Sequence, residues 1–249
     1  MLSSVTVAKI GGNEIDDTLW LERLARIVAH RTTPLVVVHG GGREVTELQR
    51  TLGAEPEWRD GLRVTTPEGL RVVSMVLSGL VNKRLAALLI GAGVEAVGIS
   101  GEDGGLLRAE PAQGGALGLT GEIREVRPQL LLSLLESGYV PVVSPVSRGP
   151  QGGALNVNAD DAASAVATGV AAERFLLVSN IPGVLRDGTV IPEVKVEEVE
   201  GLISSGVASG GMAPKLRAAA RAAKAGVREV RIGGLELLAG EGPGTRVVA

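Results

Sequence analysis

Leu35–Gln49, with the sequence LVVVHGGGREVTELQ, is the stretch that decides the fold. An apolar run typical of a buried strand ends in His39 and three consecutive glycines, and a helical pattern follows. Three glycines and the start of a helix leave backbone N–H groups uncovered, so this strand, turn and helix are suited to binding an anion. A tight turn that packs closely and binds nothing would give the same pattern.

Four other apolar runs change to small or polar residues at their carboxyl ends. They are Val5–Ile10, Ala96–Ser100, Val140–Ser144 and Phe175–Ser179. In a parallel sheet these ends lie along one edge, and ligands bind just outside that edge. We therefore predict an α/β fold with a binding site where these strands end.

Composition narrows the class of protein. The chain has 249 residues, 45% of them apolar, a net charge of −3 and no cysteine. The mixed charges and the few aromatic residues argue against a nucleic-acid surface. No apolar run reaches the roughly 18 residues of a membrane span, and a chain without disulfides suits the cytoplasm, where we expect this protein. With two histidines and no cysteine, no zinc site is expected.

Helical periodicity predicts the layers that cover the sheet. Asp16 and Asp17 can cap a helix, and Pro67 can start a long helix to about Ile90. That second helix is apolar on more than one stripe, so it is either deeply buried or shared with a second subunit, and we expect a homodimer. Further helices are expected at about 128–136, 160–172, 196–205 and 214–225. A soft boundary would divide the chain into lobes 1–172 and 173–249.

Two of the five lysines stand beside glycine turns. Lys9 lies near the end of a strand that a parallel sheet should bury, so its ammonium needs a bound anion or an internal ion pair. Lys215 follows Pro214 and should fall in the first turn of a helix, where the macrodipole disfavours a cation. A bound anion would resolve that conflict, although a solvated surface lysine would also fit the pattern.

Other polar candidates flank these lysines in the predicted fold. Asn156 and Asn158 share one face if the backbone is extended, and Asp160 follows at the head of a helix. We predict Asp160 as the helix N-cap, a position from which it could also hold two lysines in place. Arg63 carries the side chain best suited to a bidentate contact with a carboxylate, although most loop arginines are solvated.

These candidates include no convincing general base, since His39 has no obvious carboxylate partner. Phosphoryl transfer to a carboxylate needs none, because an acceptor with a pKa of about 4 is already ionised at neutral pH. It needs positioning and positive charge, which glycine amides, two lysines and a nucleotide-borne Mg²⁺ would supply. The HGGG turn also occurs in lipase-type hydrolases, but the chain has no G-x-S-x-G elbow, and it has no P-loop.

Nine motifs, taken in order, resemble the N-acetylglutamate kinases of the amino acid kinase family. They are VAKIGGN (Val7–Asn13), VVVHGGG (Val36–Gly42), GLRVT (Gly61–Thr65), LSGLVNKRL (Leu77–Leu85), VGISGEDG (Val97–Gly104), TGEIREV (Thr120–Val126), PVVSPV (Pro141–Val146), NVNADDAA (Asn156–Ala163) and GGMAPKL (Gly210–Leu216).

The resemblance implies a three-layer αβα sandwich that phosphorylates the side-chain carboxylate of N-acetyl-L-glutamate with ATP and Mg²⁺, in arginine biosynthesis. It implies that Lys9 and Lys215 stabilise the transferring phosphoryl group and that Asp160 orients them. The residues that it assigns to the acyl amino acid are Gly40, Gly41, Arg63, Asn156 and Asn158. Those that it assigns to ATP and its phosphates are Gly11, Gly12, Ser179, Asn180, Gly183, Gly210, Gly211 and Met212.

One departure leaves the acceptor open. Ser179-Asn180 stands where acetylglutamate kinases usually carry Thr-Asp, and it is more similar to kinases that act on aminoadipate or glutamate linked to an acidic amino-group carrier protein. The mixed charges of the segment Glu55–Thr66, which includes Asp60, favour the free amino acid. A sensor that keeps the fold without catalysis is an alternative of another class, and the presence of both lysines argues against it.

Overall fold

A mainly parallel sheet of 11 strands forms the centre of the computed structural model, which describes residues 4–12, 14–59, 61–240 and 242–249. Asn13 of the first motif and Asp60 lie outside the described residues. The strands that pair in parallel are β14 (Glu229–Gly233), β10 (Arg174–Val178), β1 (Thr6–Ile10), β2 (Leu35–His39), β8 (Val140–Arg148) and β5 (Ala96–Gly101).

Shorter strands extend both edges of the sheet. On the β8 side lie β6 (Leu107–Pro111), β7 (Thr120–Val126) and β9 (Ala154–Val157), and on the β14 side lie β15 (Gly244–Val248) and β13 (Glu193–Lys195). Two hairpins stand outside the sheet: β3 (Glu57–Arg59) with β4 (Leu62–Val64), and β11 (Leu185–Arg186) with β12 (Thr189–Val190). The first hairpin lies within the segment Glu55–Thr66.

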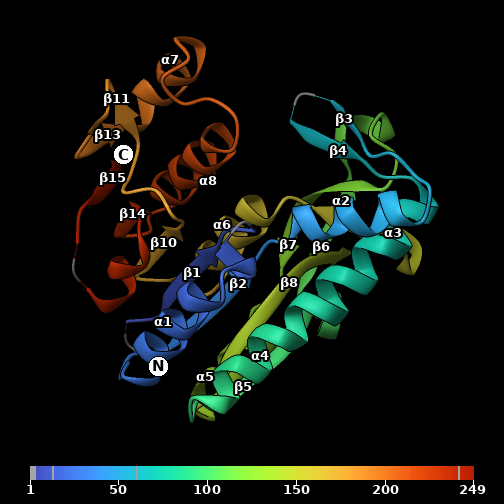
Figure 1. Cartoon of the computed structure of the whole chain (residues 1–249), viewed down its shortest axis with the longest axis horizontal. Coiled ribbons are helices and arrows are strands. Elements are labelled where there is room, and N and C mark those ends of the chain that lie inside the picture. The colour runs from blue at the N-terminus through green and yellow to red at the C-terminus, as the bar shows by residue number, and fades with distance from the viewer. Residues whose placement is uncertain (1–3, 13, 60, 241) are drawn as a thin grey trace.

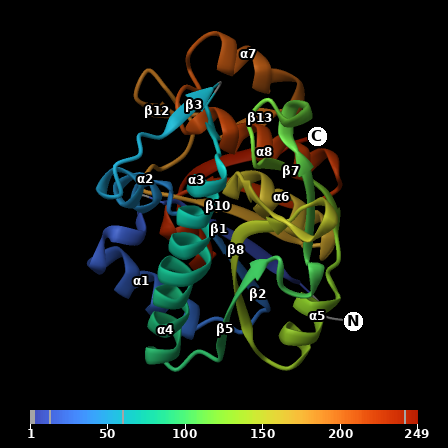
Figure 2. The same cartoon turned by 90° about the vertical axis from the view of Figure 1, so that its right-hand side faces the viewer.

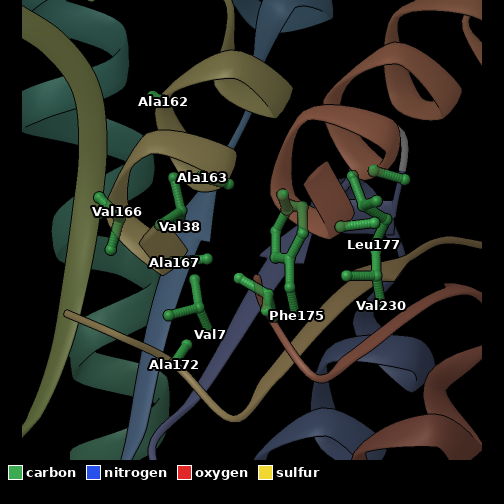
Figure 3. Packing of buried hydrophobic residues seen from close by; sticks show 14 of the residues in the cluster. Val7, Val38, Ala162, Ala163, Val166, Ala167, Ala172, Phe175, Leu177 and Val230 are labelled. Atoms are coloured by element: carbon green, nitrogen blue, oxygen red, sulfur yellow. The ribbon is translucent and has the colours of Figure 1, made fainter. Parts of the chain in front are cut away.

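The side chains of the central strands alternate between two cores, because successive residues of a strand point to opposite faces. Val7 and Val38 belong to one core, whereas Ala8 and Val37 belong to the other. Figure 3 shows the first core, in which strand residues such as Phe175 pack against the alanine-rich helix α6 (Ala159–Gly169). Burial on both faces explains why these strands read as continuous apolar runs.

Helices cover both faces of the sheet and make the predicted three layers. One face carries α1 (Thr18–Ala29), α2 (Gly42–Thr51) and the helix Pro67–Gly91; the other carries α5 (Gln129–Glu136), α6 (Ala159–Gly169), α7 (Val199–Ser204) and α8 (Met212–Lys224). In Figure 2, α1 and α4 lie on one side of the sheet, with α5 and α6 on the other. Asp17 caps α1 by accepting a hydrogen bond from the Trp20 N–H at 3.0 Å, as predicted.

The helix expected from Pro67 continues to Gly91, in three parts. They are α3 (Pro67–Val73), a π-helical segment η2 (Ser74–Val81) and α4 (Asn82–Gly91). We expected no apolar run as long as a membrane span, and this helix shows that expectation to be wrong. By length and composition it could cross a membrane, since an 18-residue window has a mean hydropathy of 1.5. Its buried face packs on β5 and β8, so the fold accounts for its apolar character.

Three helix boundaries differ from the prediction. α8 begins at Met212, two residues before Pro214, and α6 ends at Gly169. The helix expected over 196–205 is a 3₁₀ turn, η6 (Val196–Glu198), followed by α7. None of these differences moves a candidate residue away from the carboxyl edge of the sheet.

Candidate functional site

A cavity of about 690 Å³ lies at the carboxyl ends of β1, β2 and β10. Its walls come from the turns after these strands, the β3–β4 hairpin, the junction of β9 with α6, and the first turn of α8. In Figure 1 the hairpin and α8 stand on opposite arms of the molecule, with β1 and β2 between them. All the predicted site residues line this cavity except Gly183, which packs against Thr245, and Gly210.

The two glycine turns touch each other through their backbones. A Cβ added to Gly12 would lie 3.0 Å from the Gly41 nitrogen, and one added to Gly40 would lie 3.3 Å from the Gly12 nitrogen. Gly41 also has a φ of 143°, and a Cβ there would lie 2.8 Å from Leu77 Cδ2. Glycine is therefore needed to bring the amides of both turns to the same wall of the cavity.

A buried ion pair lies at the centre of the site. Lys9 Nζ lies 2.8 Å from Asp160 Oδ1, and each side chain is only 6% exposed. The prediction that Asp160 caps its helix is wrong. Asn158 is the cap of α6, because its Oδ1 accepts the N–H groups of Asp160 and Asp161 at 2.8 and 3.3 Å. The Asp160 carboxylate is thereby left free to hold Lys9.

Lys215 lies in the first turn of α8, as predicted, and faces the same cavity. Its Nζ donates to the Gly211 carbonyl at 3.2 Å, and no carboxylate of the described residues lies within 4.0 Å of it. Burial lowers the pKa of Lys215, the charge of Lys9 lowers it further, and Asp160 and Glu14 oppose this. Asp160 therefore contacts one of the two lysines rather than both, and the half-buried ammonium of Lys215 is available to an anionic ligand.

Arg63 is buried below the β3–β4 hairpin. Its guanidinium donates to the Gly42 carbonyl at 3.1 Å and to Thr46 Oγ1 at 2.8 Å, and it also donates to Gln49 Oε1. It stacks on the Trp58 ring at 4.5 Å. Burial lowers the pKa of Arg63, and the described residues offer it no carboxylate partner. The structure thus presents a fixed guanidinium to the cavity, suited to a carboxylate ligand.

Two more predicted residues have polar atoms to offer a ligand. Asn156 donates to Thr65 Oγ1 at 3.0 Å, which leaves its amide oxygen without a partner among the described residues. Ser179 is buried at the end of β10, and its Oγ has no hydrogen-bond partner in the described part of the chain. Buried polar groups are nearly always paired, so an unpaired hydroxyl lining a cavity indicates a missing partner.

Several residues of this site were not predicted from the sequence. Glu14 is buried and lines the cavity, and its Oε1 accepts the Asn180 N–H at 2.9 Å. Trp58 forms part of the wall next to Arg63. A signal for Glu14 was available, because an acidic residue two positions after a glycine turn suited to phosphate adds like charge there unless it has a partner.

His39 supports the second glycine turn from below and is fully buried. Its Nδ1 lies 2.8 Å from the Gly40 carbonyl oxygen, and its Nε2 lies 3.1 Å from Asn82 Nδ2. A carbonyl accepts and an amide NH₂ donates, so this network fits the neutral tautomer with its hydrogen on Nδ1. His39 thus contacts the backbone and Asn82 of α4, a partner that the sequence did not reveal.

The charge state of His39 makes stability depend on pH. Burial lowers its pKa to about 4, a shift that the Gly40 hydrogen bond opposes and that Arg84, Lys83 and Lys9 reinforce. The unfolded chain, with an ordinary pKa of 6.5, then binds more protons than the folded one between pH 6.5 and 4. The free energy of unfolding should therefore fall as pH falls through this window, by about 3 kcal/mol from this group.

Urea unfolding at a series of pH values would measure this slope. We expect His39→Gln to flatten the fall between pH 6.5 and 4, whatever it does to stability at neutral pH. The control is His30→Gln, because His30 is exposed. An unchanged slope in His39→Gln would show that the fully buried imidazole does not control acid stability.

Comparisons with known proteins agree with this geometry. The model of the amino acid kinase family matches residues 4–234. The acetylglutamate kinase of Methanopyrus kandleri is 47% identical over 97% of this chain and 99% of its own length, and that of Chloroflexus aurantiacus is 45% identical over 93% and 92%.

A solved structure shows the same fold. N-acetylglutamate synthase from Neisseria gonorrhoeae, in complex with coenzyme A and N-acetyl-glutamate, superposes with a TM-score of 0.85 at 26% identity, over 100% of this chain and 60% of that one. Together with the match over nearly the whole sequence, this settles the classification: the chain belongs to the amino acid kinase family.

Proposed function

We propose that the chain is an ATP-dependent kinase that phosphorylates the side-chain carboxylate of N-acetyl-L-glutamate to an acyl phosphate, in arginine biosynthesis. The observation that carries this proposal is the pair of lysines facing one cavity, with only one of them neutralised by a carboxylate. Relatives that are named acetylglutamate kinase and match nearly the whole chain support the choice of substrate.

The reaction suits the groups that line the cavity. The acceptor carboxylate is ionised at neutral pH, so one of its oxygens attacks the γ-phosphorus without a base. A new O–P bond forms as the bond to ADP breaks, and negative charge builds up on the transferring phosphoryl group and the leaving phosphate. Lys9, fixed by Asp160, and Lys215 stabilise this charge, and the glycine amides position the phosphates.

The acyl amino acid binds under the β3–β4 hairpin in this proposal. Arg63 takes its α-carboxylate, since its guanidinium is held in place and has no carboxylate partner among the described residues. Asn156 contacts polar groups near the α-carboxylate of the acyl amino acid. It uses its amide oxygen, which has no partner among the described residues. Asn158 contributes through its amide NH₂, because its oxygen already caps α6.

ATP binds on the other side of the cavity. Gly11 and Gly12 give backbone amides to its phosphates, while Ser179, Asn180, Gly211 and Met212 line the nucleotide side. Mg²⁺ bound with ATP would neutralise charge on the phosphates. We assign residues 1–172 to the amino-acid lobe and 173–249 to the nucleotide lobe, in one continuous sheet.

A parallel assay of acceptors tests the substrate assignment. Free N-acetyl-L-glutamate, N-acetyl-L-aminoadipate and carrier-linked aminoadipate or glutamate would be supplied with ATP, and acyl phosphate would be trapped as hydroxamate. We expect turnover with free N-acetyl-L-glutamate. Turnover confined to carrier-linked acceptors, the alternative that Ser179-Asn180 suggests, would reject the substrate and leave the kinase chemistry standing.

We also propose a homodimer formed through the helix Pro67–Gly91, and a cytoplasmic location. Met75, Leu80 and Ile90 of this helix are large apolar side chains that remain exposed in the single chain. Burying them against a second copy would remove that apolar surface from water. Light scattering should give the mass of two chains, and Leu80→Glu should shift it toward one; a monomeric wild type would contradict the proposal.

A further inference from the structure

Glu14 is a carboxylate inside a cavity otherwise suited to anions. It begins the short 3₁₀ turn η1 (Glu14–Asp16) after the first glycine turn, and it is only 5% exposed. Its Oε1 accepts the Asn180 N–H at 2.9 Å. Its Oε2 occupies the space beside Gly11, where an added Cβ would lie 2.0 Å from that oxygen. The absence of a side chain at Gly11 therefore makes room for this carboxylate.

The charge of Glu14 is not balanced by an adjacent cation. No lysine or arginine nitrogen of the described residues lies within 4.0 Å of it, whereas the other buried carboxylate, Asp160, is paired with Lys9 at 2.8 Å. Lys215 interacts with Glu14 only at longer range. A buried carboxylate without a close cation is costly, and phosphates arriving at Gly11 and Gly12 would add like charge. A cation between the Glu14 carboxylate and the phosphates would remove this repulsion.

Ser179 supplies a second oxygen to the same cavity. It precedes Asn180, whose N–H holds Glu14, and its buried Oγ has no hydrogen-bond partner in the described part of the chain. Carboxylate and hydroxyl oxygens are ligands that Mg²⁺ accepts, and this ion is commonly bound by one or two carboxylates together with substrate phosphates. Glu14 and Ser179 therefore fit a divalent cation that arrives with a nucleotide.

We propose that Glu14 Oε2 and Ser179 Oγ bind, directly or through water, the Mg²⁺ that accompanies the nucleotide. This inference rests on the proposed kinase function. It predicts that Glu14 favours Mg·ADP and disfavours metal-free ADP, because its charge attracts the metal and repels bare phosphate. A role limited to joining the first glycine turn to β10 predicts no such difference, since glutamine would keep the acceptor for the Asn180 N–H.

Calorimetric titration separates these roles without relying on catalysis. ADP would be titrated into the wild type and Glu14→Gln, with excess Mg²⁺ and with EDTA. The ratio of the two affinities measures the contribution of the metal. We expect Glu14→Gln to lower this ratio about tenfold or more, with metal-free ADP bound as tightly as by the wild type or more tightly. The control Glu47→Gln, on the exposed surface of α2, should leave the ratio unchanged.

Mn²⁺ provides a direct probe of the metal. Proton relaxation enhancement by Mn²⁺ with ADP should report a tight ternary complex in the wild type that weakens in Glu14→Gln and in Ser179→Ala. If Glu14→Gln fails to fold, Ser179→Ala still tests whether these residues bind the metal. An unchanged ratio, or equal losses with and without Mg²⁺, would overturn the inference and limit Glu14 to joining the first glycine turn to β10 through Asn180. A wild type that binds no ADP would instead reject the proposed function.

Discussion

Lys215→Ala should lower kcat on the order of 10²-fold or more, with a much smaller change in the KM for ATP. The ammonium of Lys215 faces the cavity without a carboxylate partner among the described residues, so its charge is available to the phosphoryl group as negative charge builds up during transfer. Groups that act mainly in the transition state appear in kcat rather than in KM. Steady-state kinetics with both substrates varied would measure this.

A matched control is available on the same helix. Lys224 ends α8 and is exposed, so Lys224→Ala removes the same charge from the same element far from the cavity and should leave kcat unchanged. Lys9→Ala should also lower kcat by 10²-fold or more, but it leaves Asp160 buried without its partner and should destabilise the fold as well. A pure KM effect in Lys215→Ala would contradict the role given to this lysine.

Arg63→Ala should raise the KM for N-acetyl-L-glutamate by roughly 10- to 200-fold, with a smaller effect on kcat. A hydrogen bond to a charged group is worth about 1.5 to 3 kcal/mol, and the guanidinium is placed for a carboxylate remote from the reacting one. Because Arg63 also contacts Gly42, Thr46 and Trp58, the variant should have a lower Tm, so kinetics must be measured where it is folded.

The control for this variant lies on the same hairpin. Arg59 is exposed and pairs with Glu57 at 3.1 Å, so Arg59→Ala should leave the KM for the amino acid unchanged. If carrier-linked substrates were the true acceptors, Arg59 would instead affect their binding, because exposed basic residues at the mouth would meet the acidic carrier. An unaltered KM in Arg63→Ala would show that another group binds the α-carboxylate.

The sequence could predict the cavity because its walls depend on local patterns. Short apolar runs that end in small or polar residues favour buried parallel strands, and parallel strands bring the turns after them to one edge. Lys9 and Lys215 could be singled out because each is placed where an unpaired cation is costly. Both features depend on local sequence rather than on long-range contacts.

What escaped prediction depends on contacts between distant segments. Glu14 meets Asn180 and His39 meets Asn82 only after folding, so neither pair leaves a periodic signal. We predicted Asp160 as the cap of α6, whereas the structure has Asn158. Both residue types cap helices, and the φ and ψ values that distinguish the cap are not visible in the sequence. The π-helical segment within Pro67–Gly91 was not predicted either.

Trapping of the acyl phosphate tests the central claim most directly. Purified protein would be incubated with ATP, Mg²⁺, free N-acetyl-L-glutamate and hydroxylamine, beside a Lys9→Ala/Lys215→Ala variant that is checked for folding by circular dichroism. The wild type should form the hydroxamate in step with ADP, and the folded variant should form almost none. Failure of the wild type to form it with any free or carrier-linked acceptor, or equal rates in the wild type and the folded variant, would contradict the account.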